Sequence, residues 1–66
     1  MKLFELVALI SADETVHIID DVNEKTLFFG KLRNVHSELD ESVLKSKKVN
    51  RIYSSFCGMC IDTADC

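Results

Sequence analysis

The sequence predicts a small α+β domain in which an N-terminal helix packs on an antiparallel sheet of three to four strands. Residues 2–10 repeat apolar side chains at the spacing of one helix face. Two strand-like runs, 15–20 and 26–31, follow and are separated by a short polar loop. This arrangement is typical of an antiparallel hairpin. A further strand-like run at 48–56 extends the predicted sheet, so the order of elements indicates a helix laid across a small sheet.

The predicted helix covers Lys2–Ile10. Its apolar residues follow the i, i+3, i+4, i+7 pattern of an amphipathic helix, and two more lie on the margin of that stripe. The stripe consists of Leu3, Leu6, Val7 and Ile10, and its margin of Phe4 and Ala8.

Alternation along the hairpin assigns each side chain to one of two faces. The face predicted to pack under the helix holds Val16, Ile18, Leu27 and Phe29. Ile19 and Phe28, beside His17, are then left on the outer face. A shift of the strand pairing by one residue would exchange the two sets.

The segment after the hairpin is predicted to connect it to the last strands, with a short helical turn inside Ser37–Leu44. The third strand covers Lys48–Phe56. Its apolar residues Val49 and Ile52 have opposite parity, which indicates either a bulge or a strand that is apolar on both sides. A turn at Cys57–Gly58 leads to a short fourth strand, residues 59–62, that returns along the third.

Composition limits the classes of function. The 66 residues form a single predicted domain, 1–66, with a net charge of −3 and no apolar run that approaches the ~18 residues of a membrane span. The basic residues do not form a stripe, so neither nucleic-acid binding nor a membrane partner is expected. The chain shows no signal-peptide pattern, and the predicted location is the cytoplasm.

Catalytic patterns are not recognisable in the sequence. The glycines are Gly30 and Gly58, which do not make a phosphate-binding loop. The serines lack the context of a nucleophile elbow. We therefore predict no enzymatic activity and no cofactor.

The cysteines suggest an alternative. Cys57 and Cys60 form a C-x-x-C pair, and Cys66 follows at the end of the sequence. Thiolates at this spacing can bind zinc, so a zinc-stabilised module built on these three residues is one hypothesis. The other is that they are reduced cysteines without a metal.

The apolar surplus on the outer face is the main functional signal. We predict that Ile19, Phe28, His17 and Tyr53 bind a protein partner or a second copy of the chain, as in a homodimer. Two alternatives remain open: residues 32–44 fold across this face and cover it, or a small homo-oligomer holds a nucleotide-like ligand between its subunits.

Several patterns resemble short accessory proteins encoded by phages and prophages of anaerobic, gut-type bacteria. These are the opening Met-Lys-Leu-x-Glu-Leu, the strand entry Asp13-Glu14-Thr15-Val16, the second strand Leu27-Phe28-Phe29-Gly30 and the late Val49-x-x-Ile52. The similarity spans about residues 1–56, and the cysteine-containing end lies outside it. Since small phage proteins of this kind include inhibitors of bacterial defence systems, the resemblance implies a non-enzymatic inhibitor that acts through an apolar sheet face with an acidic rim.

Overall fold

The computed structural model describes residues 1–56 and 58–65, and these residues form a four-stranded sheet and short helices on one of its faces. The elements in chain order are α1 (Leu3–Leu9), β1 (Thr15–Asp20), β2 (Lys25–Lys31), a 3-10 turn (Leu32–Asn34), α2 (Val35–Glu38), α3 (Glu41–Ser46), β3 (Lys47–Ser55) and β4 (Gly58–Asp65). The predicted α+β class is confirmed.

The sheet is mixed, with the strand order β2-β1-β4-β3. The hairpins β1–β2 and β3–β4 are antiparallel, as predicted, but the two central strands β1 and β4 run parallel. The prediction of a purely antiparallel sheet is therefore wrong at this one junction. A parallel pair needs a long crossover connection, and here β2, the helical segment and β3 together provide it.

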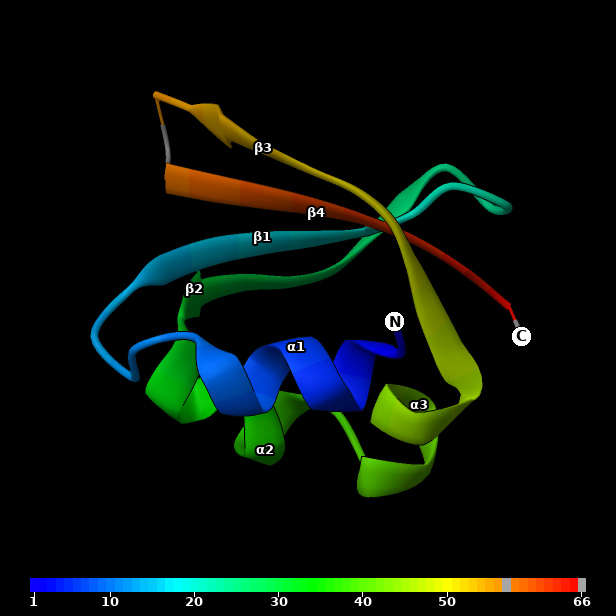
Figure 1. The fold of residues 1–66 in the computed structure, drawn as a ribbon, viewed down its shortest axis with the longest axis horizontal. Coiled ribbons are helices and arrows are strands. Elements are labelled where there is room, and N and C mark those ends of the chain that lie inside the picture. Colours follow the sequence, from blue (N-terminus) through cyan, green and yellow to red (C-terminus); the bar gives the residue numbers. More distant parts are fainter. Residues whose placement is uncertain (57, 66) are drawn as a thin grey trace.

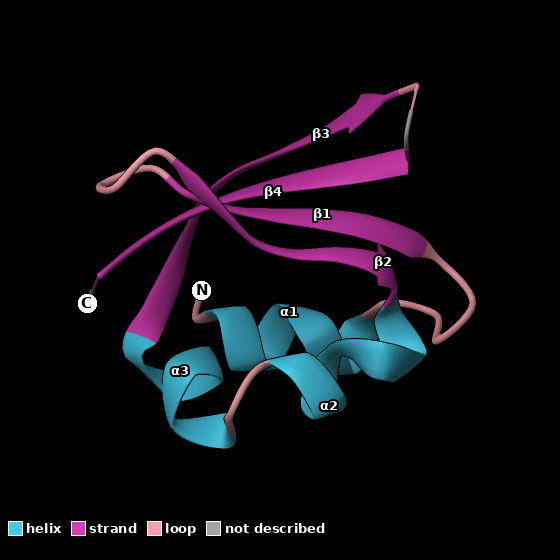
Figure 2. Ribbon diagram, turned by 180° about the vertical axis from the view of Figure 1, so that it is seen from behind, coloured by secondary structure: helices cyan, strands magenta, loops and turns pink. Residues whose placement is uncertain are grey.

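All three helices lie on the same side of the sheet (Figure 1), and the view from behind shows the same arrangement (Figure 2). Helix α1 buries Leu3, Leu6 and Val7, which belong to the predicted stripe. The Glu5 side chain accepts a hydrogen bond from the backbone N–H of Lys2 at 3.1 Å, which satisfies a donor at the start of the helix.

The segment between β2 and β3 forms α2 and α3 and packs beside α1 instead of covering the other face. Val35 and Leu44 are fully buried in the same core as α1, and Leu32 is nearly so. One alternative, that residues 32–44 cover the outer face, is therefore contradicted. The sheet keeps an inner face under the helices and an outer face with no helix on it.

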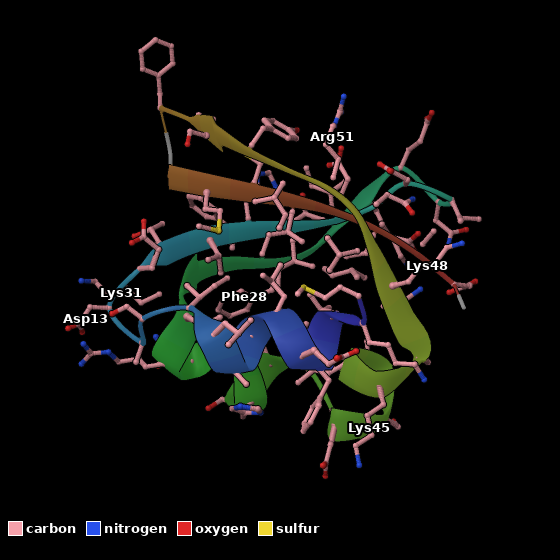
Figure 3. All side chains as sticks on the ribbon, viewed as in Figure 1. Asp13, Phe28, Lys31, Lys45, Lys48 and Arg51 are labelled. Carbon is pink, nitrogen blue, oxygen red and sulfur yellow. The ribbon has the colours of Figure 1, made fainter. Side chains whose placement is uncertain are left out.

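The orientation of β2 differs from the prediction. Ile18 faces the core and is paired with Phe28, whereas the outward His17 is paired with Phe29. Direct partners on neighbouring strands point to the same side of a sheet. Phe28 is accordingly 5% exposed and Phe29 57% exposed. Figure 3 shows Phe28 between the sheet and α1.

A β-bulge explains why simple alternation failed. The register shifts between Ile18 and Ile19, and Ile19 pairs with Thr26, so that Leu27 is an extra residue in β2. The bulge lets Leu27 and Phe28 both contribute to the core, with Leu27 partly buried.

The third and fourth predicted strands are present as β3 and β4, and β4 extends beyond the predicted residues 59–62 to Gly58–Asp65. A register shift between Val49 and Arg51 confirms that β3 contains a bulge. At the start of β4, Gly58 has a φ of 117°, and a Cβ there would lie 2.5 Å from the Thr15 carbonyl oxygen. Glycine is therefore required where β4 approaches β1. Within the described residues, no helix is long and apolar enough to cross a membrane.

The burial of the two phenylalanines predicts opposite effects of truncation. We expect F28A to lose about 3–5 kcal/mol of stability, because it opens a cavity in the core. A domain of this size has about that much stability in total. We expect F29A to lose about 1.5 kcal/mol at most, because Phe29 is 57% exposed and gives up mainly its contact with the His17 ring. In urea unfolding followed by circular dichroism, we expect F29A to keep a transition and F28A to show a strongly lowered transition or none, and equal changes in the two variants would contradict this orientation of β2.

Candidate interaction surface

The outer face carries a row of four side chains, one from each strand. Phe29 of β2 pairs with His17 of β1, His17 with Cys60 of β4, and Cys60 with Tyr53 of β3. We call these four residues the central row. Because they are consecutive cross-strand partners, they form a continuous band across the sheet on the side without helices.

The two ends of the central row are exposed aromatic rings. Phe29 is 57% and Tyr53 39% exposed, whereas Cys60, in the middle, is 5% exposed. The His17 and Phe29 rings meet edge to face, with centroids 5.3 Å apart. A contact of this kind contributes about 0.5–1.5 kcal/mol beyond the buried area. The His17 Nε2 atom also lies 2.8 Å from the Thr26 hydroxyl oxygen, so that the ring is held from two sides.

A second row lies beside the first and consists of Thr26, Ile19, Asp62 and Arg51, again one residue from each strand. Arg51 donates two hydrogen bonds to Asp62 Oδ2, from Nε at 3.0 Å and from Nη2 at 2.8 Å. The Asp62 side chain is 5% exposed, so this arginine compensates a buried charge.

Arg51 also connects the two rows, because its guanidinium carbon lies 4.9 Å from the centre of the Tyr53 ring. The hydrogen bond that Arg51 donates to the Asp62 carboxylate raises the pKa of Arg51 above its usual value. Partial burial of the phenol, with the negative charge of Asp62 nearby, raises the pKa of Tyr53. Tyr53 therefore presents a neutral ring and hydroxyl, with a fixed positive charge beside it.

The acidic turn between β1 and β2, which contains the exposed Asp21 and Glu24, is ordered by the buried carboxylate of Asp20. Asp20 Oδ1 accepts the backbone N–H of Val22 at 3.0 Å, and Oδ2 accepts the Asn23 side-chain amide at 2.8 Å. These contacts form an Asx-type turn. The acidic turn is therefore fixed at one end of the sheet.

Lys47 connects the Asp20 carboxylate to the end of β4. Its Nζ lies 3.4 Å from Asp20 Oδ2 and 2.6 Å from Asp65 Oδ1. The hydrogen bond with Asp65 raises the pKa of Lys47. The hydrogen bond that the Asn23 side chain donates to Asp20 lowers the pKa of Asp20. Both groups are thus charged over the whole neutral range.

Three of the four predicted site residues lie on the outer face: His17, Ile19 and Tyr53. The fourth, Phe28, belongs to the core, and Phe29 takes the outer position. The apolar surplus at the two phenylalanines was visible in the sequence. The bulge that places Phe28 in the core and Phe29 on the outer face was not visible in the sequence.

The cysteines are placed only in part. The Cys60 thiol lies on the outer face and donates a hydrogen bond to the Ser55 hydroxyl at 3.3 Å. Cys57 and Cys66 lie outside the described residues, so the zinc hypothesis stays a prediction. Within residues 1–56 and 58–65, no group of three or more His, Cys, Asp or Glu side chains is arranged to hold a metal ion.

Comparisons with known proteins found no matching family model, no similar curated protein and no similar solved structure. Function is therefore argued from the surface of this chain.

The Asp20 contacts predict a pH dependence of stability. The pKa of Asp20 is below its ordinary value of 3.8 in the folded protein. A carboxylate with a lowered folded pKa stabilises the fold above its unfolded pKa, and this contribution is lost as the pH falls through the folded value. We expect the wild-type protein to lose stability at pH values below about 4. We expect D20N to be less stable than the wild type at neutral pH, and its stability to change less as the pH is lowered.

Unfolding by urea at a series of pH values between neutral and acidic measures this effect. D21N is the matched control, because it removes a neighbouring exposed carboxylate. An acid dependence that is the same in D20N as in D21N would show that the Asp20 contacts are unimportant.

Proposed function

We propose that this protein is a non-enzymatic binding module that holds a protein partner against the outer face of its sheet. The observation that supports this most is the central row, in which two exposed aromatic rings lie on a face without a helix. Exposed apolar patches of this kind on small proteins mark interaction sites. Tyrosine and arginine are also the residues that most often dominate binding energy, and Tyr53 and Arg51 are stacked here.

The surface favours a partner of a particular chemistry. The central row fits an apolar or aromatic patch, whereas the acidic turn with Asp21 and Glu24 fits basic side chains at the edge of that patch. The net charge of −3 helps the encounter with a basic surface. Together with the resemblance to phage accessory proteins, these features favour an inhibitor that occupies a host protein, such as a component of a defence system.

Two surface positions provide the test. A photo-crosslinking amino acid is placed at position 29, on the outer face, or at position 9, on the helix side. Leu9 is 74% exposed and is the matched control for an apolar surface residue. In bacterial host cells we expect crosslinks to one protein from position 29 and none to that protein from position 9.

Affinity for the purified partner then measures the contribution of each side chain. We expect F29A and Y53A each to weaken binding by roughly tenfold or more, equivalent to about 1.4 kcal/mol, and L9A to leave it unchanged. We also expect the wild-type protein to inhibit the partner at an equimolar ratio. Crosslinking from position 9 alone, or equal losses for L9A and F29A in calorimetry, would overturn the proposal.

A further inference from the structure

Strand β3 forms one edge of the sheet, and within residues 1–56 and 58–65 the backbone contacts on its side away from β4 lie at its beginning. The backbone N–H of Val49 donates to the Met1 carbonyl at 2.8 Å, and Lys2 forms a bridge with Lys48. The chain start therefore closes the edge up to residue 49. From Arg51, past the bulge at residue 50, to Ser55, where β3 ends, every residue is exposed, and within the described residues no further strand lies on the side of β3 away from β4. That side is therefore an open strand edge.

The other edge of the sheet, strand β2, is protected against pairing with a strand of another molecule. Strand β2 has a lysine at each end, Lys25 and Lys31, and the bulge at Leu27. Lysines and bulges are the usual means by which proteins block edge-to-edge pairing. Past its own bulge at residue 50, β3 has no proline, lysine or further register shift. Its one charge is Arg51, which is already bound to Asp62.

The open stretch is also complementary to itself. It covers residues 51–55, the part of β3 that follows the bulge, and its middle residue is Tyr53. Antiparallel pairing with the same stretch of a second copy, about a two-fold axis at Tyr53, places Arg51 opposite Ser55 and Ile52 opposite Ser54. No like charges then face each other, which is a condition for stable cross-strand pairs.

Self-pairing would cover apolar surface that the helices do not reach. Ile52 lies on the inner side, beside the buried Ile61, yet it is 45% exposed at the sheet edge. In the symmetric arrangement the Ile52 side chains of the two copies become diagonal neighbours, which is within reach of long side chains. The Tyr53 rings of the two copies meet on the outer side.

We propose that a second copy of this chain pairs with residues 51–55 of β3 in antiparallel fashion, centred on Tyr53, to form a two-fold symmetric dimer with a continuous eight-stranded sheet. The two central rows then join at Tyr53 into one band across both protomers. This goes beyond the proposed outer-face binding, because it uses the edge of the sheet and requires no other partner. It is the isologous type of contact that closes a dimer.

The register of this pairing can be tested by charge placement. In the double variant I52K/S54K, a lysine would face a lysine at both symmetric positions, and pairing should be lost. In the matched variant I52K/S54E, opposite charges would face each other at the same positions. Both variants change residues on the inner side of β3 and leave the central row intact.

Sedimentation equilibrium under reducing conditions, over roughly 1 μM to 1 mM, gives the mass. We expect twice the chain mass of 7.5 kDa for the wild type and I52K/S54E, and the single mass for I52K/S54K. Circular dichroism confirms that both variants are folded. A monomeric wild type, a dimeric I52K/S54K variant, or loss of the dimer in both variants would each overturn the proposed pairing. None of these results would affect the crosslinking test of the outer face.

Discussion

The alternation of side chains along β1 is the constraint on which the rest of the structure depends. β1 lies in the sheet between β2 and β4 and pairs with both. Val16, Ile18 and Asp20 are 0–1% exposed on the inner face, while His17 and Ile19 point outward. Because cross-strand partners share a face, this one strand decides which residues of β2 and β4 enter the core. A shift by one residue would bury His17 in place of Ile18.

Within residues 1–56 and 58–65, the helices all lie on one side of the sheet, and its other face stays open. Side chains on the outer face contact one another: the His17 and Phe29 rings pack together, and Arg51 forms hydrogen bonds with Asp62. These contacts hold the outer side chains in place without covering them. A rigid and exposed surface of this kind loses little conformational entropy on binding, which favours affinity.

Local patterns predicted the elements of the fold well, because periodicity acts over a few residues. The predicted helix Lys2–Ile10 and the structure's Leu3–Leu9 differ by one residue at each end. The parallel pairing of β1 with β4 was beyond prediction, since it depends on packing between distant segments. The exchange of Phe28 and Phe29 has a local cause, the extra residue Leu27, but alternation alone assigns no bulge. Three of the four residues predicted to bind a partner therefore lie on the outer face and Phe28 lies in the core, whereas their role in binding stays a prediction.

Solvent accessibility of individual rings tests the division into two faces most directly. A soluble paramagnetic gadolinium chelate, added to the protein in an NMR experiment, broadens protons in proportion to their exposure. We expect strong broadening for the Phe29 ring and protection of the Phe28 ring. Protection of Phe29 together with broadening of Phe28 would contradict the assignment of the outer face.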